Sequence, residues 1–295
     1  MKSGVIIINK EEGLTSHTVV AKTKRLLGAA KAGHTGTLDP MATGVLPVLL
    51  ERGVKASDFM LTKDKHYIAT LHLGITTDTE DITGTVLTED VNVPSEEAVM
   101  SAVKGFVGKY SQVPPMYSAL KVGGKKLCDL ARSGITVERE AREVEIYSIA
   151  CEKISETDYT LDVHCSKGTY IRTLCADIGK LLGCGGVMKT LQRASASGFT
   201  LSDAYTLSQL EAMSKEEREG CVFPVEYIFR DKKEVVLSDF FGRLARAGQE
   251  IYLHKINKTF PIGEILRISD KDGFFAIGEV RDFEGKAAIK PIRQF

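Results

Sequence analysis

The sequence of 295 residues has no apolar segment long enough to cross a membrane. A membrane-spanning helix needs roughly 18 or more consecutive apolar residues, and the longest candidate, Met41–Leu50, is interrupted by Gly44 and Pro47. Near the N-terminus, the apolar run Val5–Ile8 contains only four residues and is too short for a secretory signal. We therefore expect a cytoplasmic protein without a membrane partner.

Cysteine motifs are also missing. The six cysteines, at positions 128, 151, 165, 175, 184 and 221, form no Cys-x-x-Cys pair, and no histidine follows at zinc-finger spacing. This pattern argues against a metal site and against a disulfide framework. We expect reduced thiols, as in other cytoplasmic proteins.

Net charge is the third feature that the sequence lacks, because 39 Lys and Arg balance 39 Asp and Glu. Taken alone, this neutrality argues against nucleic acid as a partner. The distribution is uneven: residues 1–65 carry ten basic and six acidic side chains, residues 66–110 two and seven, residues 201–230 three and six, and residues 231–295 twelve and ten. A neutral chain with basic ends can still present a basic face to phosphates, although ordinary surface scatter gives the same counts.

The hydrophobic fraction of 43% is enough for a folded core, and local patterns predict both helices and strands. Predicted strands are Val5–Ile8, His66–Gly74 with Gly84–Leu87 as its partner, Val144–Ile154 and Tyr159–Cys165. Predicted helices run from Thr15 or Ser16 to Leu27, around Val54–Leu61, after Ser95, over Lys125–Ser133 and over Tyr170–Leu182. The elements alternate without the regular period that a parallel sheet would demand.

The character of the chain changes near Pro224. From Glu234 onward short β-type segments recur, and turns such as Asp272-Gly273 and Glu284-Gly285 separate them. A β-rich unit of about 65 residues lies within the usual size range of domains. We therefore predict two domains, residues 1–230 and residues 231–295.

The segment Gly33–Gly44 contains three glycines, three threonines, His34 and Asp39. Glycines allow a backbone to approach a ligand closely, but no Gly-Lys-Ser/Thr follows, which argues against a nucleotide P-loop. Asp39 precedes a proline, so it is either a catalytic carboxylate or the start of an ordinary turn. The residues alone leave both interpretations open.

Two further segments carry polar groups that could act in a site. In Lys167–Leu174, Gly168 and Thr169 could cap the predicted helix and place Arg172 near its start. The helix dipole disfavours a cation there, so either Arg172 has a carboxylate or phosphate partner, or it is an ordinary surface arginine. Tyr67 lies on the predicted strand after Lys65, where core packing is the alternative to a ligand contact.

In order and spacing, these segments resemble the TruB family of tRNA pseudouridine synthases over about residues 4–200. Gly33–Pro47 resembles the family's motif around its catalytic Asp, Lys65-His66-Tyr67 its second motif, and Lys167–Arg172 its third. Asn9-Lys10…Gly13…Ser16 and Pro114–Ala119 are similar to further family segments, and the chain beyond 231 is similar to the family's small PUA-related RNA-binding domain. The chain departs from the family at Glu11 (usually Pro), at Glu51–Lys55 (usually Gly-x-Ala-Thr-Lys) and at Cys128 (commonly aromatic), and none of these departures removes a catalytic residue.

The resemblance implies an α+β catalytic domain with a mixed, largely antiparallel central sheet and flanking helices, followed by a small β-rich PUA-like domain. It implies isomerisation of uridine-55 in the T-loop of tRNA to pseudouridine, without redox change and therefore without a cofactor. Asp39 would be the nucleophilic carboxylate, Arg172 would pair with it, and Tyr67 would stack on the flipped base. Attack on the ribose, attack on the base and removal of a ribose proton all remain open as the role of Asp39.

The resemblance also implies contacts with the RNA. His34 would fill the space that the flipped base leaves, Tyr170 would contact the substrate, and Lys10, Lys55 and Lys167 are candidate phosphate contacts, with solvated surface lysines as the alternative. Residues 231–295 would grip tRNA through its phosphates. We expect a monomer without an obligate protein partner, because the relatives that use guide RNA carry longer basic tails.

Other function classes remain to be weighed against this enzyme. A non-catalytic RNA-binding protein or chaperone on the same fold would not need Asp39, Tyr67 and Arg172. A related synthase acting on another RNA and a phosphate-binding α/β enzyme are further alternatives, and the missing P-loop lysine counts against the last.

Overall fold

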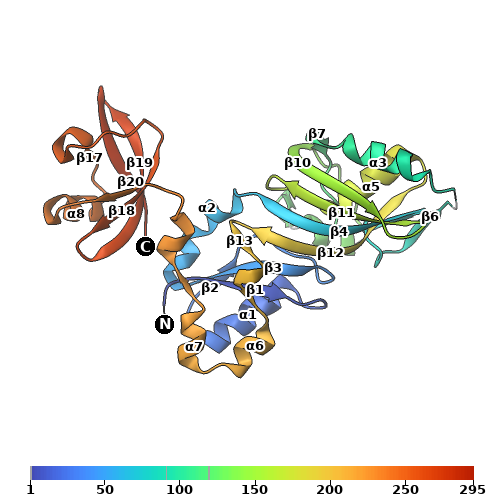
Figure 1. Cartoon of the computed structure of the whole chain (residues 1–295), viewed down its shortest axis with the longest axis horizontal. Helices are drawn as coiled ribbons and strands as arrows, with labels where there is room; N and C mark the ends of the chain where they lie inside the picture. Colours follow the sequence, from blue (N-terminus) through green and yellow to red (C-terminus); the bar gives the residue numbers. More distant parts are fainter. Residues whose placement is uncertain (1, 91, 119) are drawn as a thin grey trace.

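The computed structural model describes residues 2–90, 92–118 and 120–295, which form two lobes (Figure 1). Of the similarity segment Pro114–Ala119, Ala119 lies outside the described residues. A large lobe contains an 11-stranded sheet with its helices, and a small lobe contains a separate 5-stranded sheet near the C-terminus. The predicted α+β architecture is confirmed.

The large sheet is mixed and largely antiparallel, with the strand order β14-β1-β3-β12-β4-β11-β10-β7. Only the pairs β1–β14 and β3–β12 are parallel within the described part of this sheet. Its strands are β1 (Gly4–Lys10), β2 (Ala32–His34), β3 (Thr43–Leu50), β4 (Lys65–Leu73), β7 (Gly108–Gln112), β10 (Arg142–Lys153), β11 (Asp158–Cys165), β12 (Gly186–Ala196), β13 (Phe199–Thr200), β14 (Ala204–Tyr205) and β15 (Phe223–Pro224). Two hairpins stand apart, β5 (Ile75–Thr77) with β6 (Val86–Glu89), and β8 (Lys121–Val122) with β9 (Lys125–Lys126).

Helices flank this sheet, and α5 packs against β12 and β4. The helices of the large lobe are α1 (Ser16–Leu27), η1 (Glu51–Ala56), α2 (Ser57–Leu61), α3 (Glu96–Lys104), α4 (Leu127–Arg132), α5 (Ile171–Leu182), η2 (Leu201–Asp203), α6 (Leu207–Ala212), α7 (Lys215–Gly220) and η3 (Val225–Phe229). Their apolar faces and the inner face of the sheet form one core, in which truncating a buried leucine such as Leu71 would cost about 2–5 kcal/mol.

Local sequence signals explain several elements well. The Thr15 side chain accepts a hydrogen bond from the backbone of Thr18 at the start of α1, and Gly28 ends this helix in the left-handed conformation. Ser95 caps α3 as predicted. The alternation in β4 is confirmed, because every second residue from Lys65 to Leu73 is buried.

Two predictions about local structure are wrong, and two strands were not predicted. Gly84–Leu87 does not pair with the strand at 66–74: β6 pairs with β5, whereas β4 lies between β11 and β12. Strands β3 and β12 were not predicted, because apolar and polar residues do not alternate regularly along them. The start of α5 is capped by neither Gly168 nor Thr169; its N-cap is Tyr170, which makes no side-chain capping bond.

The small lobe has the strand order β16-β18-β19-β20-β17 and its own core. Its elements are β16 (Glu234–Val236), α8 (Asp239–Arg246), β17 (Ile251–Tyr252), η4 (Leu253–Ile256), β18 (Ile265–Asp270), β19 (Gly273–Phe283) and β20 (Lys286–Gln294). The β-rich character was predicted, but α8 was not. This helix is fastened to the sheet by Arg246, whose Nε and Nη2 donate to the carboxylate of Asp270 at 2.9 and 3.0 Å.

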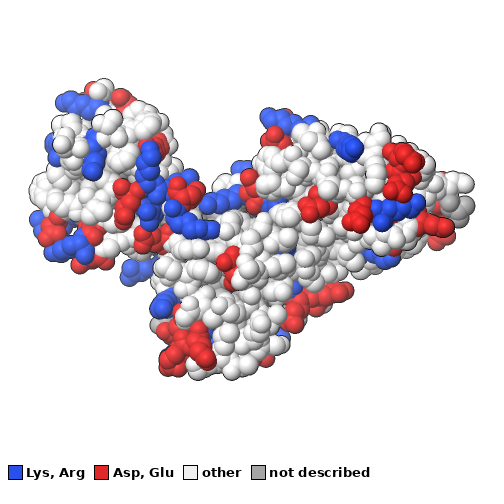
Figure 2. Space-filling view, in the orientation of Figure 1, with Lys and Arg blue, Asp and Glu red and all other residues white. Residues whose placement is uncertain are grey.

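The two lobes share an apolar contact. Val5 and Ile7 of β1 belong to the same buried cluster as Phe229 of η3 and Ile277 of β19, and the ring of Phe295 packs on this cluster. On the surface, a notch separates the lobes, and Lys and Arg side chains gather on both of its sides (Figure 2). The cavity at this junction is lined by residues of both lobes and of the segment that connects them, including Phe59, Lys63 and Lys232.

Within the described ranges, no helix is both long enough and apolar enough to span a membrane. The six cysteines are free thiols, and the same ranges contain no cluster of His, Cys, Asp or Glu arranged to hold a metal ion.

Candidate active site

The loop between β2 and β3 carries Asp39, and side chains from two neighbouring elements hold its backbone. Ser16, at the start of α1, accepts from the Leu38 amide at 2.9 Å and donates to the Leu38 carbonyl at 3.0 Å. Lys10, at the end of β1, donates to the carbonyls of Pro40 and Ala42. The residues on both sides of Asp39 are therefore fixed, and its carboxylate projects from a held loop.

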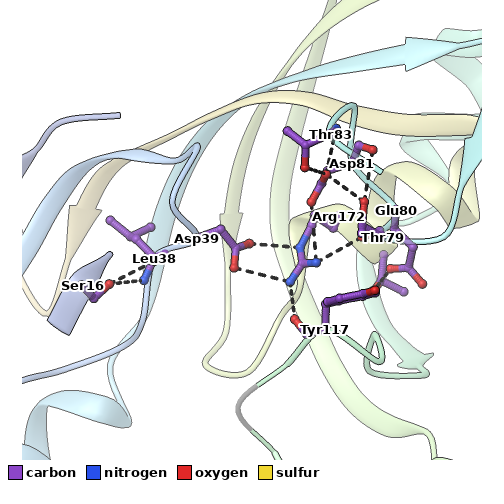
Figure 3. A network of polar contacts seen from close by, with 10 residues as sticks. Ser16, Leu38, Asp39, Thr79, Glu80, Asp81, Thr83, Tyr117 and Arg172 are labelled. Atoms are coloured by element: carbon purple, nitrogen blue, oxygen red, sulfur yellow. Dashed lines mark hydrogen bonds and ion pairs between the residues drawn. The ribbon is translucent and has the colours of Figure 1, made fainter. Parts of the chain in front are cut away.

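Arg172 is the partner of this carboxylate (Figure 3). Its Nε lies 3.0 Å from Oδ2 of Asp39 and its Nη2 lies 3.5 Å from Oδ1, so the planar guanidinium faces both carboxylate oxygens. The same group donates to the carbonyl oxygens of Tyr117 at 2.7 Å and Thr79 at 3.1 Å. With 6% of its side chain exposed, Arg172 is locked in one orientation.

A second carboxylate supports this arginine. An oxygen of Asp81 lies 3.7 Å from Nη1 of Arg172. Asp81 is itself held by three hydrogen bonds, from the Thr79 hydroxyl at 2.9 Å, the Thr83 hydroxyl at 2.6 Å and the Thr83 amide at 3.0 Å (Figure 3). Two carboxylates thus compensate a cation that the helix dipole would otherwise disfavour at the start of α5.

The backbone that carries Arg172 is positioned by a buried amide. Gln112 of β7 accepts from the Tyr170 amide at 2.8 Å and donates to the Tyr170 carbonyl at 3.0 Å. These two bonds fix the residue that precedes α5. They explain how the helix can start there without a side-chain cap.

These elements enclose a pocket of about 270 Å³. Asp39 and Arg172 lie on its wall, and the Tyr67 side chain from β4, 8% exposed, also lines it. The remaining lining residues are Gly36, Thr37, Leu38, Leu61, Lys65, Tyr117, Ser118, Gly168, Thr169, Tyr170, Ile171, Leu191 and Arg193. This volume lies slightly below the range of pockets that hold drug-sized ligands, so the pocket fits a small ligand.

Burial raises the pKa of the Asp39 carboxyl above its ordinary value, and the Arg172 guanidinium opposes this rise. Asp81 adds to the rise through like-charge repulsion. Through the pocket, 34% of the Asp39 side chain still reaches solvent. A carboxylate in this setting is more basic than a solvated aspartate and is open to a ligand, as a nucleophile or general base requires.

Burial also raises the pKa of the Tyr67 phenol. The ring therefore stays uncharged at physiological pH and offers a flat surface beside the carboxylate. A ring of this kind can stack on a planar ligand.

Four of the predicted site residues meet in this pocket, namely Asp39, Tyr67, Tyr170 and Arg172. The phosphate contact predicted for Lys10 is contradicted. Its side chain is fully buried and its ammonium is taken up by backbone carbonyls, so no phosphate can reach it. Burial lowers the pKa of Lys10 to about 8, and the residue serves the loop rather than the RNA.

The other predicted residues lie around the pocket. Lys167 is exposed, just before the lining residues Gly168 and Thr169. Lys55 is exposed at the junction of the lobes, where its ammonium donates to the Gln294 carbonyl at 3.0 Å. His34 does not line the pocket; its ring packs edge-on against His17, with a centroid distance of 5.4 Å.

Sequence reasoning missed Asp81, Tyr117, Gln112 and Arg193. Tyr117 lies in the family-like segment Pro114–Ala119, but its contribution is a backbone carbonyl, and Gln112 contributes a side-chain amide outside any recognised motif. Asp81 lies in a Thr-rich turn, and its flanking threonines were the only local sign that a carboxylate is held there. Arg193 lies on a strand that was not predicted.

Comparison with known proteins shows that the chain is similar to one family of enzymes. The family model described as "TruB family pseudouridylate synthase (N terminal domain)" matches residues 24–171, and the model described as "tRNA pseudouridylate synthase B C-terminal domain" matches residues 172–230. The chain is 42% identical to tRNA pseudouridine synthase B of Alkaliphilus oremlandii over 282 residues, 95% of this chain and 94% of the relative. It is 41% identical to the protein of the same name in Francisella tularensis subsp. tularensis, over 94% of this chain and 91% of the relative.

Solved structures agree with the sequence comparison. A structure entitled "Crystal Structure of a Cbf5-Nop10-Gar1 Complex" contains a chain that matches 99% of this one, with a TM-score of 0.75 and 27% identity, over 85% of its own length. The archaeal box H/ACA sRNP Nop10-Cbf5 complex gives a TM-score of 0.70 at 26% identity, over 99% of this chain and 86% of the other. Both lobes are therefore covered by the similarity.

Proposed function

Because the chain belongs to the TruB family of pseudouridylate synthases, we propose that it isomerises uridine-55 in the T-loop of tRNA to pseudouridine. The observation that carries this proposal is the carboxylate of Asp39, paired with Arg172 and facing a pocket lined by Tyr67. The names of the relatives support tRNA as the substrate.

The reaction breaks the bond between N1 of uracil and C1′ of the ribose and forms a bond between C5 and C1′. The proton on C5 is lost and N1 gains one, so the product is an isomer and no electrons enter or leave. The pocket must therefore hold a base that has left its stack, at a cost of a few kcal/mol. Asp39 assists cleavage of the C–N bond, Arg172 keeps it ionised and oriented, and Tyr67 stacks on the base while it turns.

Contacts beyond those of Asp39, Arg172 and Tyr67 would hold the RNA. We assign the exposed Lys55 and Lys167 to phosphates, Tyr170 to the nucleotide beside the target, and His34 to the space that the flipped base leaves. Phosphate contacts position the substrate without reading its sequence.

We also propose that residues 231–295 are a second domain with a PUA-like role, which grips tRNA away from the reacting uridine. Lys255, Lys258 and Lys286 are exposed, and none has an ion-pair partner within the described part of the chain. Lysines of this kind are available for phosphates. We propose that the enzyme acts in the cytoplasm as a monomer, without a guide RNA, an obligate protein partner or a cofactor.

The test is pseudouridine mapping of tRNA incubated with the purified protein and no added cofactor. Wild-type protein should convert uridine-55, and Asp39→Asn should abolish conversion while folding and tRNA binding stay nearly intact, since the amide keeps the shape and loses the charge. An Asp39→Asn protein that works at more than a few per cent of the wild-type rate would remove Asp39 from the mechanism. Binding without conversion by the wild type would instead favour an RNA chaperone.

A further inference from the structure

Arg193 of β12 is a buried cation beside the active site that the mechanism above does not use. Its side chain is 1% exposed, yet it lines the pocket that holds Asp39 and Tyr67. Burying a guanidinium is costly unless other groups compensate its charge. Within the described ranges, Arg193 forms no ion pair with a carboxylate, in contrast to Arg172.

The donors of Arg193 go to the segment that carries Asp39. Its Nε donates to the Val45 carbonyl at 2.7 Å, and its Nη2 donates to the Gly36 carbonyl at 3.1 Å. Gly36 precedes Asp39 and Val45 follows it. One rigid fork therefore fastens the chain on both sides of the carboxylate.

The charge of the same guanidinium also acts on the Tyr67 phenol, because it opposes the rise in pKa that burial causes there. In the sheet, Arg193 lies opposite Tyr67 of β4 on one side and opposite Gly44 of β3 on the other. It thus stands between the strand that bears the ring and the strand that follows the carboxylate.

The backbone contact on the Asp39 side is unusually close. A Cβ at Gly44 would lie 2.3 Å from the Arg193 carbonyl oxygen, which leaves no room for a side chain. Gly44 also has a φ of +103°, a backbone conformation that residues with a Cβ rarely adopt. This approach sets where β3 lies relative to β12. The Arg193 side chain therefore reaches the Asp39 segment from a fixed position on β12.

We propose that Arg193 is a positioning residue, which sets the distance and angle between the Asp39 carboxylate and the Tyr67 ring. It does so by fastening both sides of the Asp39 segment, through one planar group, to the strand in which Arg193 lies opposite Tyr67. Lysine cannot replace it, because lysine lacks the planar fork from which Nε and Nη2 reach the Val45 and Gly36 carbonyls in two fixed directions. The inference rests on the proposed function, since its readout is pseudouridine formation.

The experiment compares Arg193→Lys with wild-type protein and with Arg218→Lys. Arg218 is a matched control: it donates to the carbonyls of Leu210, Leu26 and Glu211 in the same lobe and does not line the pocket. Single-turnover rates at saturating enzyme, dissociation constants for tRNA and thermal unfolding are measured for all three proteins. Rates are taken at a temperature where each is folded.

We expect Arg193→Lys to bind tRNA as tightly as wild type but to react about 100-fold more slowly, the loss typical of a reacting group displaced by about 1 Å. Arg218→Lys should lose thermal stability and keep the wild-type rate. A rate for Arg193→Lys within about threefold of Arg218→Lys would overturn the inference. A wild-type protein that forms no pseudouridine would count against the proposed function instead.

If Arg193→Lys does not fold, Gly36→Ala tests the same link from the side of the loop. A Cβ at Gly36 would lie 3.2 Å from Nη1 of Arg193, whereas Gly28, which also has a positive φ, has nothing within 4 Å of its Cβ position, so Gly28→Ala controls for backbone strain. We expect a single-turnover rate for Gly36→Ala at least tenfold below that of Gly28→Ala, with unchanged tRNA affinity. Equal rates for the two variants would then refute the proposed link between Arg193 and the Asp39 segment.

Discussion

Replacing Arg172 by lysine tests whether the geometry of the ion pair matters beyond its charge. The arginine spans both oxygens of Asp39 and also binds the carbonyls of Tyr117 and Thr79. Lysine keeps the charge on a more flexible stem, without the planar fork. It can serve one carboxylate oxygen, and it leaves at least one of the buried carbonyls without a partner.

The magnitude follows from these contacts. A hydrogen bond to a charged group contributes about 1.5–3 kcal/mol. If one such bond to Asp39 is absent in the transition state, the rate falls roughly 10- to 150-fold. An unpaired buried carbonyl costs about 1–3 kcal/mol of folding stability in addition, so Arg172→Lys should lower the melting temperature as well as the rate.

The assay is single-turnover conversion of tRNA at saturating enzyme, with Arg218→Lys as the control for reduced stability. Saturation separates the chemical step from weaker binding, and thermal unfolding shows how much protein is folded. A rate for Arg172→Lys within about threefold of wild type would show that charge alone suffices. The planar contact with Asp39 would then have no part in catalysis.

Two further outcomes follow from the electrostatics. Because burial raises the pKa of Asp39, the carboxylate is protonated at a higher pH than a solvated aspartate. The single-turnover rate should therefore decline with falling pH already above about pH 4. A rate that stays constant down to about pH 4 would contradict the role of this burial. Changing Lys255, Lys258 and Lys286 to Gln should weaken tRNA binding and reduce its salt slope by about one for each phosphate that is no longer neutralised, without changing the single-turnover rate at saturating enzyme. Lys153→Gln, at a lysine paired with Glu96 in the large lobe, is the control; an unchanged slope in the triple variant would remove these lysines from the RNA interface.

The lysine variants are preferable to deletion of the small lobe. Ile277 is buried against the large lobe, and Phe274 and Phe295 pack on the same cluster. Removing residues 231–295 would expose Phe229 and its neighbours to water, so weaker binding could reflect unfolding. Exposed lysines can be changed without disturbing this apolar cluster.

Elements that depend on near neighbours along the chain could be predicted from the sequence alone. The caps of α1 at Thr15 and Gly28 and the alternation of β4 are local properties, because a helix start and a strand face are set within a few residues. The residues around Asp39, Tyr67 and Arg172 left the roles of all three open, and only the resemblance to a family predicted that they share a site. The structure brings the three side chains to one pocket.

Spatial neighbours, in contrast, are established only when the chain folds. Asp39 and Arg172 are 133 positions apart in the chain, and only the fold brings their side chains to 3.0 Å. Strand pairing is equally non-local, which is why β6 was assigned to the wrong partner and β12 was missed. No signal near Asp81 or Arg193 in the sequence revealed that Asp81 supports Arg172 or that Arg193 lines the pocket.

Lys10 shows the limit most clearly. A lysine in a short motif is usually exposed, and its sequence context allowed a phosphate contact. In the fold its ammonium is buried against the carbonyls of Pro40 and Ala42, thirty and more positions away along the chain. Local sequence selects conformations over a few residues, whereas burial and the partner of a charged group depend on segments that meet only when the chain has folded.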